Sequence, residues 1–127
     1  MAVAVHSKLL LNLACVYRRP NSDLDHFTDA MHKLLSEMDG IQCDDPSIEH
    51  HTLILGDFNL DANDQCTAKF NRCVLPTFTQ VVLHPTIDSG SIIDHAYTTL
   101  PADTIECFVG ESYFSDHNPI FVAIRLP

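Results

Sequence analysis

Two nearly continuous apolar runs limit what this chain can fold into. Residues 9–17 read LLLNLACVY, and residues 51–55 read HTLIL. A run without regular polar alternation is typical of a strand that is buried on both faces, as in the interior of an α/β sheet. The chain must therefore supply covering layers on both sides of these two strands.

The segment between the two runs has the period of an amphipathic helix. After a break at residues 18–21, Ser22 can cap a helix, and Gly40 ends the pattern. The apolar positions of this stripe share one helix face, so we expect them to pack in the core. They are Phe27, Met31, Leu34, Leu35 and Met38.

In the rest of the chain, proline and glycine residues divide the apolar patterns into short segments. The pattern predicts a short helix at 67–75, an irregular stretch at 76–91, and strands near 92–99, 104–109 and 119–126. A strand–helix–strand start that is followed by successive strands indicates one α/β domain with a mixed sheet. The length of 127 residues agrees with a single domain.

The charge balance restricts the partners of the chain. The formal net charge is -10, and Lys and Arg together number seven. A nucleic-acid surface usually carries a basic patch, so the composition argues mildly against nucleic acid. Carboxylates attract Mg²⁺ or Ca²⁺, and the composition therefore permits a cation site.

Cysteine usage and hydropathy predict an intracellular protein. The five cysteines are an odd number without a C-x-x-C pair, which fits neither a disulfide framework nor a zinc site. We expect reduced and mostly buried thiols. The apolar start is not interpreted as a signal peptide, because Lys8 lies between two apolar stretches and not ahead of them. No apolar stretch is long enough to span a membrane.

Three short segments place polar groups at the ends of predicted strands. The first is GDFN at 56–59, where Asp57 and Asn59 are two residues apart and would face the same side of an extended chain. Asp94 lies just inside a later strand, and Asp116 with His117 precedes the last strand. Each segment alone is weak, because an Asp before a turn is usually a cap. Their joint occurrence in this order is much more specific.

Together these segments resemble the endonuclease/exonuclease/phosphatase (DNase I-like) superfamily. The family motif G-D-F-N stands at 56–59, G-x-x-I-D-H at 90–95 and S-D-H at 115–117, and Tyr17 precedes a proline–asparagine turn. The resemblance runs from about residue 9 to residue 126. It implies an α/β fold, namely the C-terminal half of a DNase I-like four-layer α/β sandwich with a mixed, mainly antiparallel sheet.

The resemblance also implies catalytic roles. His117 corresponds to the imidazole at the scissile phosphate, and Asp94 to the carboxylate that orients it. Asp57 corresponds to the group that positions or deprotonates the attacking water. Asn59 corresponds to a donor to a phosphate oxygen in the transition state, and Tyr17 to a phosphate contact.

The cofactor implied by the resemblance is Mg²⁺, with Mn²⁺ as an alternative. Asp116 corresponds to a metal ligand, and Asp57 lies nearby. Hydrolysis of a phosphodiester brings hydroxide to a centre that is already anionic. Mg²⁺ supplies positive charge there and keeps several waters, so that one or two protein carboxylates suffice.

Part of the family pattern is missing. The first half of the family fold brings an Asn and a Glu that is the main metal ligand, and residues 1–8 are too few to supply both. The four Glu residues, at 37, 49, 106 and 111, do not stand where the family places that ligand. We therefore expect residues 1–127 to be a partial domain whose inner sheet face needs the missing half, or a second copy in a homodimer, to cover it.

The segment before Asp94 indicates a branch of the superfamily. FTQVVLHPT at 78–86, followed by DSGSIIDH at 88–95, is similar to endonuclease domains of retrotransposons and Helitron-like mobile elements. That resemblance implies a DNA endonuclease that acts on DNA in the nucleus. Two alternatives remain. One is a phospholipid or inositol-phosphate phosphodiesterase, which predicts a pocket lined by Lys and Arg. The other is a catalytically inactive remnant or binding module.

Several polar residues near these motifs have plainer interpretations. His95 should point to the opposite face from Asp94 and is expected to be structural. Arg18 and Arg19 either contact phosphate or form a solvated strand end. Asn21 is expected to be a turn residue, and Asn118 to hold the turn before Pro119.

Overall fold

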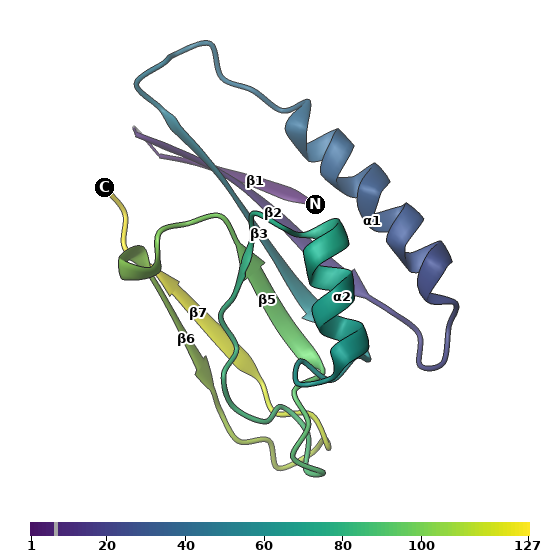
Figure 1. The fold of residues 1–127 in the computed structure, drawn as a ribbon. Helices are drawn as coiled ribbons and strands as arrows, with labels where there is room; N and C mark the ends of the chain where they lie inside the picture. The colour runs from purple at the N-terminus through teal and green to yellow at the C-terminus, as the bar shows by residue number, and fades with distance from the viewer. Residues whose placement is uncertain (7) are drawn as a thin grey trace.

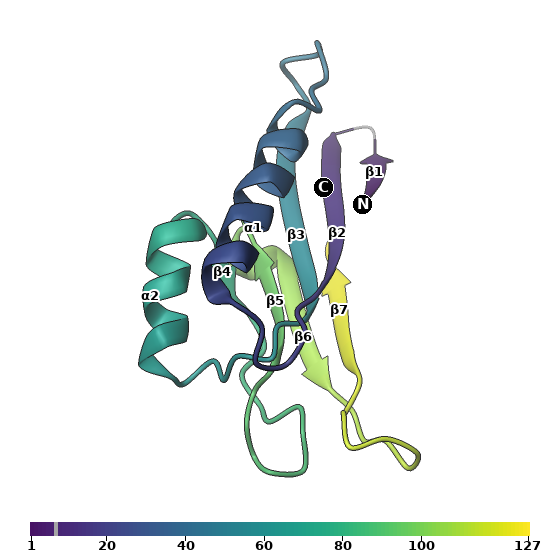
Figure 2. The ribbon, with the colours of Figure 1, turned by 90° about the vertical axis from the view of Figure 1, so that its right-hand side faces the viewer.

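The structure is a computed structural model that describes residues 1–6 and 8–127. Helices, a five-stranded sheet and a two-stranded sheet follow one another as three layers (Figures 1 and 2). The elements are β1 (Ala2–His6), β2 (Leu9–Tyr17), α1 (Leu24–Asp39), β3 (Glu49–Asp57), α2 (Gln65–Val74), β4 (Thr79–Gln80), β5 (Asp94–Thr98), the 3₁₀ helix η1 (Ala102–Thr104), β6 (Ile105–Val109) and β7 (Ile120–Ile124).

The main sheet has the strand order β1-β2-β3-β5-β4. Strands β2 and β3 are parallel, with α1 as the crossover between them, and the other neighbours in this sheet are antiparallel. Strands β6 and β7 form a separate antiparallel pair. The prediction of a mixed, mainly antiparallel sheet is therefore confirmed.

The two helices cover one face of the main sheet (Figure 2). Met31 and Met38 of α1 and Phe70 of α2 belong to a buried cluster that includes Ile54 of β3. Phe27 of α1 stacks on Phe70 with ring centroids 5.5 Å apart. The apolar stripe between the two predicted strands is therefore core packing, as expected.

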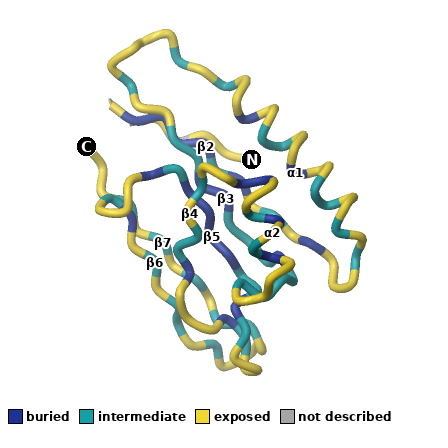
Figure 3. Tube along the Cα trace, viewed as in Figure 1, coloured by how far each residue is buried: buried dark blue, intermediate teal, exposed yellow. Residues whose placement is uncertain are grey.

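The β6–β7 pair covers the opposite face. Leu11 and Leu53, neighbours of the helix-facing residues along β2 and β3, pack in a second buried cluster with Ile105 of β6. Figure 3 shows that buried residues gather in the central strands. On the outer side of the β6–β7 pair, Phe108 and Phe121 stand opposite each other, and more than half of each side chain is exposed.

Some local predictions were wrong. The sequence pattern indicated no strand before residue 9, yet β1 pairs with β2 along its length. The cap of α1 is Asp23, whose side chain accepts a hydrogen bond from the Asp25 N–H at 2.9 Å, and not Ser22. Either residue type can cap a helix, so local sequence could not choose between neighbours.

The cysteines are less buried than expected. All five are free, as expected of reduced thiols, but three of them are exposed and two are half-buried. Exposed Cys66 and Cys73 lie on α2, and exposed Cys15 lies on β2. Among the described residues, no helix combines the length and apolar character that a bilayer crossing needs.

Gly56 is required by the close approach of β2 and β3. Its φ is 150°, and a Cβ built on it would lie 1.8 Å from the Val16 carbonyl oxygen. We therefore expect Gly56→Ala to lower the free energy of unfolding by more than about 2 kcal/mol in urea titrations. Gly90→Ala is the matched control, because Gly90 also has a positive φ but open space around it. Equal losses in the two variants would contradict the role of the Val16 contact.

Candidate active site

The ends of β3 and β5 bring two carboxylates together. Asp57 is the last residue of β3 and Asp94 the first of β5, and the two pair directly across the antiparallel strands. Their side chains are 21% and 15% exposed. Partial burial raises the pKa of Asp57 above its ordinary value, and the negative charge of Asp94 adds to that increase.

His117 joins these carboxylates from the segment before β7. Its Nδ1 lies 2.9 Å from one carboxylate oxygen of Asp94, and its Nε2 lies 3.8 Å from a carboxylate oxygen of Asp57. A carboxylate can only accept, so Nδ1 carries the hydrogen of this bond. Burial by itself lowers the pKa of His117, but the hydrogen bond and the charges of Asp94, Asp57 and Asp116 outweigh it and raise the pKa.

Thr86 connects the segments that carry Asp94 and His117. Its buried hydroxyl oxygen accepts hydrogen bonds from the N–H groups of Ile93 and Asp94, each at 3.1 Å. Its carbonyl oxygen accepts a bond from the Asn118 N–H at 2.7 Å. The sequence placed Thr86 in a motif without a role, and a Thr that is buried between two polar loops could not be recognised from spacing alone.

Asn59 is fixed beside Asp57 by its backbone and its amide. Its φ is 47°, its N–H donates to the Asp57 carboxylate at 3.0 Å, and its side-chain amide donates to the Arg18 carbonyl oxygen. The left-handed conformation is one that Asn tolerates better than most residues. The loop after β3 therefore has a defined shape next to the carboxylate pair.

Arg18 is a structural residue of this loop. It is 7% exposed, and its guanidinium donates to the carbonyl oxygens of Asn59 at 3.1 Å and Ser22 at 2.6 Å. The same group lies 5.9 Å from the centre of the Phe27 ring. The interpretation of Arg18 as a solvated strand end was wrong. Its side chain is buried because the guanidinium group donates hydrogen bonds to two carbonyl oxygens of the surrounding loops.

The structure does not bring every predicted site residue into the cluster. Tyr17 pairs with Asp57 in register on β2, but its side chain is 66% exposed. Asp116 is exposed beside His117. In the described part of the chain, the one group of three or more possible ligands with atoms within 4.8 Å of one another is Asp57, Asp94 and His117.

His95 has the structural role that the strand alternation predicted. It is completely buried, its Nε2 donates to the Ile92 carbonyl oxygen at 2.8 Å, and its Nδ1 accepts from the Tyr97 hydroxyl at 2.8 Å. It also stacks on Phe58. Burial lowers the pKa of His95, which keeps this ring neutral.

The two asparagines outside the cluster shape turns, as predicted. Asn21 has a φ of 56°, which is turn backbone. Asn118 accepts a hydrogen bond from the Ser112 N–H on its side-chain oxygen at 3.3 Å. The contact with Ser112 holds Asn118 in the loop before β7.

A cavity of about 340 Å³ opens beside the cluster. Asp57, Asp94 and His117 line it together with further residues of the loop before β7, among them Glu111 and Phe114. Among the residues that the structure describes, none of those lining this cavity is Lys or Arg. The cavity can therefore accept a metal ion and one singly charged phosphate group, but its described lining offers no basic side chain for several phosphates clustered on one small molecule.

The coupling between Asp94 and His117 can be measured. We expect Asp94→Asn to lower the pKa of His117, observed through its ring protons by NMR, because the variant removes the charge that stabilises the protonated ring. Asp103→Asn, on η1, is the control and should leave that pKa unchanged.

The same pair sets a pH dependence of stability. Because the folded pKa of His117 is raised, its stabilisation is complete below about pH 6.5, the unfolded value, and is lost as pH rises through the folded pKa. The difference in unfolding free energy between the native chain and Asp94→Asn should shrink over that interval. A difference that grows with pH would contradict the assignment.

Comparison with known proteins identifies the fold. The sequence matches no protein-family model and no curated protein sequence. The structure is similar to CdtB, the biologically active subunit of cytolethal distending toxin, with a TM-score of 0.56 and 17% identity over 97% of this chain and 51% of that chain. It is also similar to cytolethal distending toxin from Actinobacillus actinomycetemcomitans (TM-score 0.62, 17% identity, 96% and 51%) and from Haemophilus ducreyi (0.61, 18%, 96% and 51%). The chain spans about half the length of these structures, and over that half it has the DNase I-like α/β fold.

Proposed function

We propose that this chain is part of a divalent-metal-dependent nuclease that hydrolyses phosphodiester bonds in DNA. The observation that carries the proposal is the convergence of Asp57, Asp94 and His117 from three separate segments at one cavity. The fold is that of DNase I-like nucleases, to which the motifs of the sequence are also similar. A carboxylate pair beside an oriented imidazole is suited to hydrolysis of a phosphate ester.

The donor set of this cluster fits a divalent cation. The carboxylates of Asp57 and Asp94 offer the oxygen ligands that Mg²⁺ and Mn²⁺ prefer. Asp116 stays a predicted ligand that would approach from the exposed rim. When bound, the ion would supply positive charge that stabilises the negative charge developing on the phosphate.

The protein groups then have separate tasks. Asp57, whose pKa is raised by burial, is suited to orient and deprotonate a water. His117 is held through Nδ1 by Asp94, which leaves Nε2 for a proton transfer to a phosphate oxygen. Asn59 and Tyr17 flank Asp57, one on the same loop and one on the neighbouring strand, and are proposed as phosphate contacts.

DNA is the substrate that these observations favour over a polyphosphorylated inositol head group. A polyphosphate head group needs several cationic contacts, and the described lining of the cavity supplies no Lys or Arg. A single diester presents one charge, which one metal ion can offset. The similarity of residues 78–95 to mobile-element endonucleases extends the proposal to a retrotransposon or Helitron-like enzyme, and for that reason to the nucleus.

Nicking of supercoiled plasmid tests the activity. We expect Mg²⁺-dependent conversion to open circles that EDTA abolishes and that His117→Ala reduces by at least about a hundredfold, since general acid–base groups contribute that much. His84→Ala, at an exposed histidine outside the cluster, should retain activity. Folded protein that fails to nick would contradict a working site within residues 1–127 and favour an inactive remnant or binding module.

Measurements of Mn²⁺ affinity can distinguish Asp57 from Asp116 as the metal ligand without an activity assay. We expect Asp57→Asn to weaken Mn²⁺ affinity by at least about tenfold, measured by paramagnetic broadening of nearby NMR signals, because it removes a ligand from the three-residue group. Asp116→Asn should have a smaller effect, since Asp116 lies outside that group. The reverse order would favour the ligand set that the motif predicts.

A further inference from the structure

We propose that Thr86 is a positioning residue of the active site, which holds the Asp94 carboxylate and the His117 ring in contact. Thr86 is completely buried, so it cannot touch a substrate and must act through its neighbours. This role rests on the proposed function, because the Asp94–His117 pair is the acid–base group of that function. The first test, however, measures the pair itself and needs no nuclease activity.

The start of β5 depends on the Thr86 hydroxyl for its hydrogen bonds. Strand β4 pairs with Tyr97 and Thr98 near the other end of β5 and does not reach Asp94. In its place, the Thr86 hydroxyl oxygen accepts hydrogen bonds from the N–H groups of Ile93 and Asp94, each at 3.1 Å. An N–H group that loses its acceptor inside a protein is costly, so this one oxygen fixes the backbone that carries the Asp94 carboxylate.

The backbone of Thr86 holds the segment that carries His117. Its carbonyl oxygen accepts a hydrogen bond from the Asn118 N–H at 2.7 Å, and the next residue, Ile87, forms an antiparallel bridge with His117. The Thr86 N–H donates to the Ser91 carbonyl oxygen at 3.0 Å, which closes the loop that leads to β5. Both members of the carboxylate–imidazole pair are therefore attached to the same buried residue.

This common attachment matters because the pair joins two layers of the fold. Asp94 belongs to the main sheet and His117 to the segment before β7, and Nδ1 lies 2.9 Å from the carboxylate oxygen. The bond keeps the hydrogen on Nδ1 and leaves the lone pair of Nε2 for a proton transfer. A displacement of about 1 Å in such a pair can lower a rate by about a hundredfold. Thr86 is placed to prevent that displacement.

The ring nitrogens of His117 report this role directly. In the neutral ring, their ¹⁵N chemical shifts show which nitrogen carries the hydrogen, and the native chain should carry it on Nδ1. Thr86→Val keeps the shape of the side chain but removes the acceptor, so the preference for Nδ1 should be lost. Thr86→Ser keeps the oxygen and should restore that preference.

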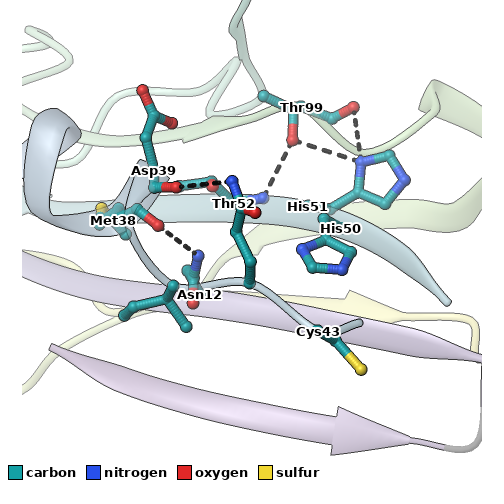
Figure 4. Close-up of a pocket in the computed structure, with 10 residues that line it drawn as sticks. Asn12, Met38, Asp39, Cys43, His50, His51, Thr52 and Thr99 are labelled. Carbon is teal, nitrogen blue, oxygen red and sulfur yellow. Dashed lines mark hydrogen bonds between the residues drawn. The ribbon is translucent and has the colours of Figure 1, made fainter. Parts of the chain in front are cut away.

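Thr99 offers a matched control beyond the opposite end of β5 (Figure 4). It lines a separate cavity of about 600 Å³ beside Asn12, and its hydroxyl oxygen accepts a hydrogen bond from the Thr52 N–H at 2.9 Å. A strand rises by about 3.3 Å per residue, so Thr99 lies roughly 16 Å along the chain from Asp94. Thr99→Val should therefore lower stability in urea titrations but leave the His117 ring shifts unchanged.

Nicking kinetics separate positioning from substrate binding. With Mg²⁺ and saturating plasmid, Thr86→Val should nick about tenfold to a hundredfold more slowly, as expected when a residue orients a reacting group without touching substrate. The plasmid concentration at half-maximal rate should change by less than about twofold, because binding of DNA is not altered. If the native chain does not nick at all, the proposed function fails, while the ring shifts still decide the role of Thr86.

Three results would overturn this role: native ring shifts in Thr86→Val, no restoration by Thr86→Ser, or an equal effect of Thr99→Val. Urea titration shows whether each variant is folded. If Thr86→Val does not fold, hydrogen exchange of the native chain decides the matter. The amides of Ile93 and Asp94 should then open together with the Nδ1–H of His117, and independent exchange would contradict a shared attachment to Thr86.

Discussion

The parallel pairing of β2 and β3 is the contact on which the rest of the structure depends. It runs for nine residue pairs, from Leu9 opposite Glu49 to Tyr17 opposite Asp57. Parallel strands need a crossover, and α1 both provides it and covers one face of the pair. The register then decides what each end of the sheet presents: Asp57 and the loop after it at one end, and the cavity beside Asn12 at the other.

Electrostatics explain why this chain is built around an opposed carboxylate pair. Asp57 and Asp94 face each other in a partly buried position, which raises the pKa of Asp57. Like charges at this separation are tolerated when a positive group lies between or beside them. His117 partly fills that role through Asp94, and a divalent ion would complete it.

The sequence was informative where the signal was local or carried by a motif. Strand 9–17 was predicted with its observed bounds, since a continuous apolar run reports burial on both faces. The motifs also named the three residues that converge at the cavity. Features that depend on contacts between distant segments could not be predicted. Arg18 is buried under a loop 41 residues away, and Thr86 joins two segments through hydrogen bonds that no spacing encodes. Strand β1 was missed because its sequence is short and only mildly apolar. Its extended conformation depends on pairing with β2.

The position of His117 just before β7 ties the chemistry to the way the layers dock. The β6–β7 pair shares no strand pairing with the main sheet and meets it through side chains of the second buried cluster. Thr86, through Asn118 and the bridge between Ile87 and His117, is the backbone connection near the site. A partial opening that detaches the hairpin would therefore remove the imidazole while β2, β3 and both carboxylates keep their places. The geometry of the three-residue group thus depends on how β6 and β7 dock onto the main sheet, and it can be lost well before the main sheet itself unfolds.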